Sequence, residues 1–181
     1  MLALLTAVAV LAGALCLLNL VLTLGVVRRL REHAVLLAKL QPAAAPNPML
    51  AVGEQVGSFE TVTVDGHPVS RDALDGPTLL GIFSPNCSAC AERLPKFVDL
   101  AGGYPGGRER VLAVVVGDEH EAAAQVRALA PVARVVVEDA DGAISQAMGV
   151  RGYPAFGVLD EGGHVLSAGT NLDLLDVLVG A

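Results

Sequence analysis

The amino-acid sequence predicts an α/β fold in which helices cover both faces of a mixed sheet. From residue 49 onward, short apolar runs typical of buried strands alternate with segments of helical composition. The last two strand-like segments are separated by a short turn, so we expect them to pair as an antiparallel hairpin. Alternating strands and helices that end in a hairpin predict a sheet with both parallel and antiparallel strands.

The first 27 residues form an apolar segment that carries no charged side chain. The segment is long enough to cross the roughly 30 Å hydrocarbon core of a bilayer. A cleaved signal peptide is the alternative, but it needs a basic N-terminal region, and no Lys or Arg precedes Arg28. Helical character also continues through Glu32 to Leu40. We therefore predict an uncleaved transmembrane helix over residues 1–27.

Residues 28–48 are predicted to be a juxtamembrane helix followed by a linker. The linker, Gln41 to Pro48, contains prolines that block a continuing helix and favour an extended spacer. The remaining residues, 49–181, are of ordinary single-domain size and can bury a core of their own.

The elements of this domain are placed by hydrophobic period and turn residues. Residues 59–64 alternate as a half-buried strand does, and Asp65-Gly66 predicts a turn that returns along His67-Pro68-Val69. One helix is expected to begin near Cys87, and two more are expected at 119–129 and 171–179. The other expected strands lie at 77–83, 111–116, 132–137, 155–159 and 164–168.

Charge and histidine placement limit the classes of partner. The chain has 12 Lys and Arg against 19 Asp and Glu, for a formal net charge of −7, which argues against nucleic acid as the main partner. The histidines are scattered over juxtamembrane, turn and loop positions: His33, His67, His120 and His164. The sequence therefore predicts neither a metal site nor a bound cofactor.

Cys87-Ser88-Ala89-Cys90 follows a strand-like run and opens a helix-like one. A thiol at a helix N-terminus lies near the positive end of the helix dipole and near unpaired N–H groups, which favour the thiolate. The second thiol can then close a disulfide, so the pair is predicted to be redox-active. A static disulfide and half of a zinc site are the alternatives, but a zinc site normally needs two further ligands and no second Cys pair exists.

Three stretches resemble known proteins: Gly53 to Val69, Phe83 to Pro95 and Val150 to Val165. On these stretches the chain resembles the thioredoxin fold, and more closely the membrane-anchored, thioredoxin-like proteins of the TlpA/ResA group. It is especially similar to the MauD-like branch, which is associated with methylamine dehydrogenase maturation. The resemblance extends over the soluble domain and implies a thioredoxin-like thiol-disulfide oxidoreductase.

The resemblance also implies roles for individual residues. Cys87 would be the exposed attacking thiolate and Cys90 the more buried resolving thiol of a redox disulfide. Tyr153-Pro154 matches the family's cis-proline, whose backbone edge receives the incoming peptide, so we expect a cis bond here. Asn86, beside the first cysteine, completes the predicted substrate-binding set.

The sequence departs from the family at three positions. Asn86 replaces the tryptophan that often precedes the first cysteine, and the chain contains no tryptophan. Gly81 occupies the place where thioredoxin has a buried aspartate for proton transfer, and Arg93 stands where ResA-type members have a glutamate. Substrate choice is therefore expected to differ, and proton transfer is left without an assigned residue.

These observations predict a membrane-tethered thiol-disulfide oxidoreductase. Its expected partners are protein thiols or disulfides, with a membrane electron-relay protein as a further candidate. The direction of exchange cannot be read from Ser88 and Ala89. Two alternatives stay open: a non-catalytic thioredoxin-fold binding module at the membrane, and a peroxiredoxin-like peroxidase, although residues 83–87 lack the threonine of the peroxidase motif.

The side of the membrane is predicted from two opposing arguments. Arg28, Arg29 and Arg31 follow the apolar segment, and the positive-inside rule would place the following domain in the cytoplasm. The family resemblance implies the outer face instead. Because the positive-inside preference is a bias that a translocated domain can override, we expect an extracytoplasmic domain on a single-pass anchor in the cell membrane.

Overall fold

The computed structural model describes Asn19 and residues 47–172, and the chain divides into two compact units, Met1–Ala44 and Ala45–Ala181. The fold below belongs to the second unit. The segment predicted to cross the membrane, apart from Asn19, and most of the helix predicted at 171–179 lie outside the described residues. Among the residues that are described, no helix has both the length and the apolar character needed to span a bilayer.

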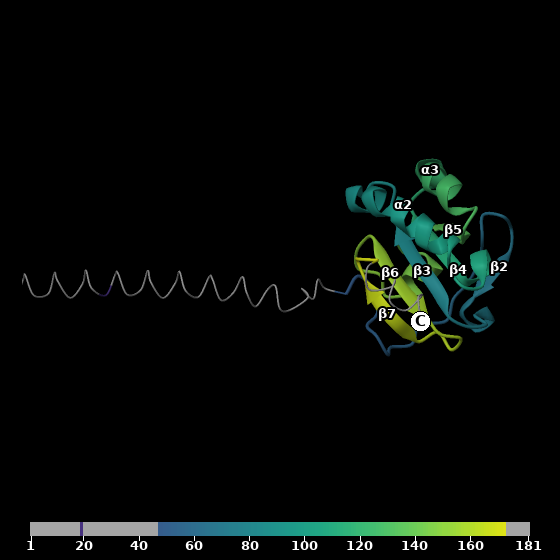
Figure 1. The fold of residues 1–181 in the computed structure, drawn as a ribbon, viewed down its shortest axis with the longest axis horizontal. Coiled ribbons are helices and arrows are strands. Elements are labelled where there is room, and N and C mark those ends of the chain that lie inside the picture. Colours follow the sequence, from purple (N-terminus) through teal and green to yellow (C-terminus); the bar gives the residue numbers. More distant parts are fainter. Residues whose placement is uncertain (1–18, 20–46, 173–181) are drawn as a thin grey trace, which may run out of the picture. The chain divides into compact units, whose positions relative to one another are not determined.

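The centre of the domain is a five-stranded mixed sheet with the strand order β5-β4-β3-β6-β7 (Figure 1). β3, β4 and β5 are parallel to one another. On the other side of β3, β6 pairs antiparallel with β3, and β7 pairs antiparallel with β6. The predicted mixed sheet is thus confirmed. The strand bounds are β3 Thr78–Phe83, β4 Val111–Val116, β5 Arg134–Glu138, β6 Ala155–Leu159 and β7 Val165–Gly169.

A separate two-stranded sheet precedes the main one. Its strands, β1 (Glu60–Val62) and β2 (Pro68–Ser70), pair antiparallel across the Asp65-Gly66 turn, as predicted. Gly66 has a φ of +84°, which a residue with a side chain rarely adopts. The turn is held by the hydroxyl of Thr63, which accepts a hydrogen bond from the His67 N–H at 3.0 Å.

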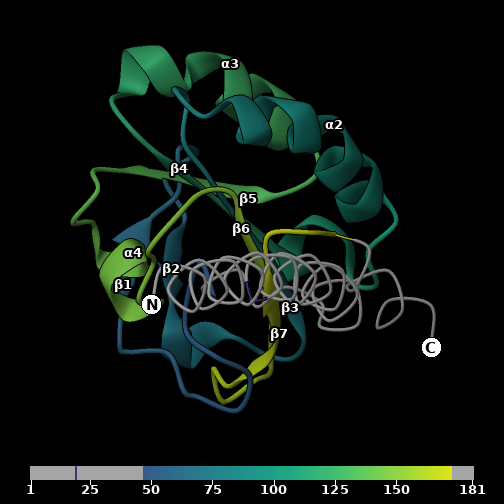
Figure 2. The same ribbon diagram turned by 90° about the vertical axis from the view of Figure 1, so that its left-hand side faces the viewer.

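Helices lie on both faces of the main sheet, as the alternation of elements predicts. α2 (Ser88–Gly102) and α3 (Glu119–Leu129) lie side by side on one face, and α4 (Ala143–Ala147) lies near β1 and β2 on the other (Figure 2). Two short 3-10 helices occupy Arg71–Ala73 and Gly107–Arg110. The sequence did not predict α4, because five residues are too few to show a helical period.

The core consists of two apolar clusters, one on each face of the sheet. Alternate residues of β4 enter opposite clusters: Val111, Ala113 and Val115 face α2 and α3, while Leu112 and Val114 face α4. Because β4 is buried on both faces, its sequence is a continuous apolar run rather than an alternating one. Burying each large apolar side chain contributes about 1.5–3 kcal/mol, so the central strands form a rigid platform for the loops at their ends.

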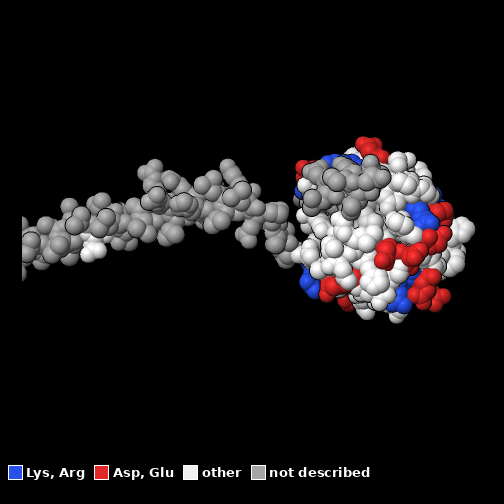
Figure 3. All heavy atoms as spheres, turned by 60° about the horizontal axis from the view of Figure 1, so that its bottom comes forward, with Lys and Arg blue, Asp and Glu red and all other residues white. Residues whose placement is uncertain are grey.

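The surface carries charges of both signs. Ion pairs join Arg108 to Asp65 at 2.6 Å and Arg110 to Asp75 at 3.3 Å. On the face drawn in Figure 3, acidic and basic side chains are likewise interspersed, and no broad basic patch is visible there.

Candidate redox site

The cysteine pair lies where the central strand of the sheet meets the first long helix. β3 pairs with β4 on one side and β6 on the other, and it ends at Phe83. A short loop, Ser84 to Asn86, leads to Cys87, which is the N-cap residue of α2 in an extended conformation (φ −111°, ψ 109°). Strand, loop and helix therefore place both cysteines at the carboxyl end of the parallel strands, where ligands of open α/β sheets bind.

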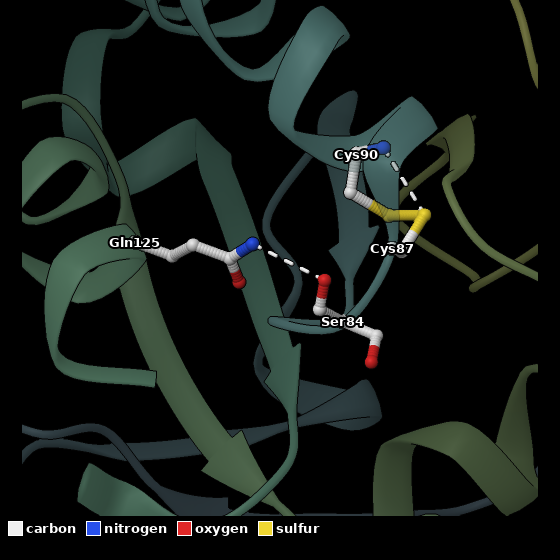
Figure 4. Close-up of a disulfide and its surroundings, with 4 residues drawn as sticks. All are labelled: Ser84, Cys87, Cys90 and Gln125. Carbon is white, nitrogen blue, oxygen red and sulfur yellow. Dashed lines mark hydrogen bonds between the residues drawn. A yellow bond between two sulfur atoms is a disulfide. The ribbon is translucent and has the colours of Figure 1, made fainter. Parts of the chain in front are cut away.

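Cys87 and Cys90 form a disulfide, with their Cα atoms 5.1 Å apart (Figure 4). The Sγ of Cys87 accepts a hydrogen bond from the backbone N–H of Cys90 at 3.1 Å. Such a bond, together with the helix dipole, favours a negative charge on Cys87 when the pair is reduced.

The two sulfur atoms differ in burial in the direction that was predicted. Cys87 is partly exposed, whereas Cys90 is 0% exposed and belongs to the apolar cluster beneath α2. An incoming sulfur atom can reach Cys87 but not Cys90. Apolar surroundings also disfavour a charged Cys90, so the geometry fits an attacking thiolate at Cys87 and a resolving thiol at Cys90.

The start of β6 lies next to the end of β3, since Ala155 pairs with Ile82. The preceding Tyr153–Pro154 peptide bond is cis, as predicted. Tyr153 is half-buried and packs against the same apolar cluster as Cys87. Burial, followed by the negative charge of Glu138, raises the pKa of the Tyr153 hydroxyl above its usual value. The fold thus brings the predicted cis-proline segment to the cysteine end of the sheet.

Asn86, the predicted neighbour of the thiol, is exposed and is tied to α3. Its Nδ2 donates a hydrogen bond to Oε2 of Glu121 at 3.1 Å. Glu121 lies in the first turn of α3, which begins at this edge of the sheet because the Asp118 carboxylate accepts the His120 and Glu121 N–H groups at 2.9 Å each. Sequence reasoning did not single out Glu121, which lies 35 residues from Asn86.

Gly81, which the resemblance to thioredoxin matches to a proton-transfer aspartate, has no room for a side chain. A Cβ atom added at Gly81 would lie 2.6 Å from two ring atoms of Phe97 and 2.9 Å from the ring of Phe83. The rings of Phe83, Phe97 and Phe156 pack together with centroids 5.2 to 5.7 Å apart. An aromatic cluster therefore fills the space next to Gly81.

The other charged candidates lie on α2. Arg93 is partly buried in the second turn, and Glu92 beside it is exposed. Over the part of the chain that the structure describes, no group of three His, Cys, Asp or Glu side chains is placed to hold a metal ion.

Solved structures with this fold are similar over most of the domain. The thioredoxin domain of a thiol-disulfide oxidoreductase from Bacteroides vulgatus is 16% identical, with a TM-score of 0.59 over 71% of this chain and 96% of that one. A thio-disulfide isomerase from Thermus thermophilus is 19% identical (TM-score 0.56; 73% and 99% covered). The pneumococcal exposed lipoprotein thioredoxin from Streptococcus pneumoniae is 23% identical (TM-score 0.52; 69% and 100% covered).

These likenesses show a thioredoxin-like fold. No curated protein sequence matches the chain significantly. The model of the AhpC/TSA family matches residues 52–168, which include the strands that the structure describes, from β1 to the next-to-last residue of β7. Since this match spans more than half of the chain, the protein belongs to the AhpC/TSA family.

Proposed function

We propose that the protein is a thiol-disulfide oxidoreductase that exchanges disulfides with protein substrates through Cys87 and Cys90. The observation that carries the proposal is the difference between the two sulfur atoms of one disulfide. One is a partly exposed helix cap that accepts an N–H hydrogen bond, and the other is fully buried. The names of the Bacteroides vulgatus and Thermus thermophilus structures support the same chemistry.

In the reducing direction, the Cys87 thiolate attacks one sulfur of a substrate disulfide. A mixed disulfide forms, and the other substrate sulfur leaves as a thiolate that takes up a proton. Cys90 then loses its proton and attacks Sγ of Cys87, which releases the second substrate sulfur and re-forms the Cys87–Cys90 disulfide. Two electrons pass from the protein dithiol to the substrate. The same steps in reverse oxidise a substrate dithiol.

The residues beside Cys87 form the proposed substrate contact. Tyr153 and Pro154 approach from the start of β6, and Asn86 precedes the thiol on the α2 side. An extended substrate segment placed along the backbone before β6 would lie close to Cys87. Without a tryptophan at position 86, this contact is smaller and more polar than in the family that the sequence resembles.

We further propose that the domain is tethered to the membrane by residues 1–27 and works on the extracytoplasmic side, as a TlpA/ResA-like and MauD-like protein. Support comes from the sequence: an uncharged apolar segment, a proline-containing linker and the three resembling stretches. A reporter fused after Ala181 that is active only in one compartment tests the side. Activity of a cytoplasmic reporter would contradict the extracytoplasmic placement.

The redox proposal is tested by the reduction potential of the Cys87/Cys90 couple in the full-length protein, solubilised in mild detergent. The protein is equilibrated in glutathione or dithiothreitol buffers, and free thiols are counted by alkylation. We expect a reversible two-electron titration between about −270 and −120 mV, the range of known thiol-disulfide enzymes. A disulfide that resists strong reductant would overturn the proposal and favour the non-catalytic binding module.

The family match gives a reason to test the peroxidase alternative as well. A peroxiredoxin-like enzyme would consume hydrogen peroxide at a rate that depends on Cys87 but not on Cys90, since peroxide oxidises a single thiolate to a sulfenic acid. The pairing of Cys87 with Cys90 instead favours dithiol exchange. Peroxide consumption by the Cys90→Ser variant equal to that of the wild type would favour the peroxidase.

A further inference from the structure

Gln125 is a buried polar residue that the exchange steps above do not use. It lies on the face of α3 that packs onto the sheet, between the fully buried Ala122 and Leu129, and its own exposed fraction is 7%. An amide buried on a helix face of this kind is uncommon, because apolar side chains fill such positions at lower cost in desolvation.

The amide reaches the loop that carries the first cysteine. Nε2 of Gln125 donates a hydrogen bond to the backbone carbonyl oxygen of Ser84 at 3.2 Å (Figure 4). The same carbonyl accepts the backbone N–H of Cys87 at 3.3 Å. One oxygen atom therefore links α3 to the backbone of Cys87, across 41 residues of sequence from Gln125 to Ser84.

The other end of the amide has no partner. Oε1 of Gln125 is buried and accepts no hydrogen bond from any residue that the structure describes. A flipped amide would place Oε1 against the Ser84 carbonyl, so that two acceptors would face each other. The hydrogen bond that Nε2 donates to Ser84 therefore fixes the orientation of the Gln125 amide. A buried amide with one unpaired end is costly, so packing alone does not account for a glutamine here.

We propose that Gln125 is a positioning residue for Cys87. By holding the Ser84 carbonyl, it fixes the turn that keeps Cys87 at the N-terminus of α2, where Sγ accepts the Cys90 N–H at 3.1 Å. The hydrogen bond from Gln125 to Ser84 keeps Sγ of Cys87 in position to accept the Cys90 N–H. This stabilises the Cys87 thiolate in the reduced protein. This inference rests on the proposed function, because it concerns the reactivity of the same thiol.

The test compares wild type with Gln125→Met, which keeps the side-chain length but removes the N–H donor. Both proteins are used at full length in mild detergent. In glutathione buffers, the ratio of disulfide to dithiol in the variant should rise about fivefold at a given buffer composition, which is ~20 mV for a two-electron couple. Alkylation of Cys87 at neutral pH should slow about threefold, because less thiolate is present.

Leu129→Met is the matched control, since it changes a buried side chain on the same face of α3, and an aliphatic side chain cannot hydrogen-bond the Ser84 carbonyl. We expect its redox equilibrium to stay within twofold of wild type. Two results would overturn the inference: a Gln125→Met equilibrium within twofold of wild type, or an equal shift in Leu129→Met. A wild-type disulfide that does not titrate at all would instead overturn the proposed function.

A measurement on the unmodified protein covers the case in which Gln125→Met does not fold. The side-chain N–H signals of Gln125 in NMR spectra should exchange with solvent at least tenfold more slowly than those of Gln55 and Gln146, whose side chains are exposed. They should also shift when the disulfide is reduced. Exchange as fast as that of the two exposed glutamines would overturn the inference.

Discussion

Phe97 occupies the space that a side chain at Gly81 would need, with two ring atoms 2.6 Å from the position of an added Cβ. Gly81 lies in the middle of β3 and Phe97 in α2, and both are buried. The contact explains why the strand carries glycine at this position. It also means that proton exchange with Cys90 does not use a carboxylate at this position.

Gly81→Ala is expected to lower the free energy of unfolding by about 2 kcal/mol, because an overpacked core must displace the Phe97 ring. Urea unfolding followed by circular dichroism measures the change. Gly152→Ala is the matched control, since an added Cβ there meets nothing within 4 Å, and its effect should stay within about 0.5 kcal/mol. Equal stability of Gly81→Ala and wild type would contradict the close contact.

Replacing the buried cysteine is expected to stop exchange halfway. In Cys90→Ser, Cys87 can still attack a substrate disulfide, but no thiol resolves the product, so about one equivalent of mixed disulfide should accumulate per protein molecule. Non-reducing electrophoresis and mass spectrometry detect the adduct. Cys87→Ser is the control and should form none. Adducts on Cys90 in Cys87→Ser would show that the assigned roles are reversed.

Asp65 is expected to add pH dependence to stability. Hydrogen bonds from Thr63 at 2.5 Å and from Arg108 at 2.6 Å lower the pKa of Asp65 to about 2. The pKa of Asp65 in the folded protein lies below the unfolded value of about 3.9. The Asp65 carboxylate therefore stabilises the fold fully above about pH 4, and this stabilisation is lost as the pH falls through about 2. Carbon-13 NMR titration of the carboxyl group measures the pKa directly.

Arg108→Met should raise the pKa of Asp65 toward its ordinary value, and it should reduce the loss of stability between about pH 4 and pH 2. The variant Asp65→Asn, which cannot titrate, should remove this part of the pH dependence altogether. An Asp65 pKa near 4 in the wild-type protein would contradict the hydrogen bonds seen here.

The bond between Asn86 and Glu121 is expected to affect catalysis more than stability. Both side chains are exposed, so Glu121→Ala should change the unfolding free energy by less than about 1 kcal/mol. If the bond orients Asn86 toward substrate, kcat/KM for a protein disulfide should fall about threefold, equivalent to ~0.7 kcal/mol. Coupled assays of disulfide reduction measure the rate.

Asn86→Ala should lower kcat/KM by a similar factor, and the double variant should add little, because one interaction is removed in each case. Glu161→Ala is the control, since this exposed residue lies in the β6–β7 turn at the other end of β6 from Pro154. Equal losses in Glu161→Ala and Glu121→Ala would point to a general charge effect instead.

Much of the fold could be predicted because its information is local. The bounds predicted for α3 and β6 match the structure, since hydrophobic period and composition reveal an eleven-residue helix and a buried strand. β5 begins at Arg134 and not at Val132, because the N–H groups of Val132 and Ala133 both bond the Leu129 carbonyl and continue the turn after α3. A composition pattern cannot show such a boundary, which depends on where each N–H finds its acceptor.

The sequence predicts the cysteine pair, its position between a strand and a helix, and its redox chemistry, since a helix N-terminus and a Cys-x-x-Cys spacing are short-range features. It does not predict the partners of that pair. Gln125 and Glu121 reach the loop from α3, and Tyr153, which only the family resemblance predicts, lies in the segment just before β6. The strand order β5-β4-β3-β6-β7 brings these chain segments to the same end of the sheet. Hydrogen bonds between residues 35 and 41 positions apart depend on packing, which no local pattern encodes.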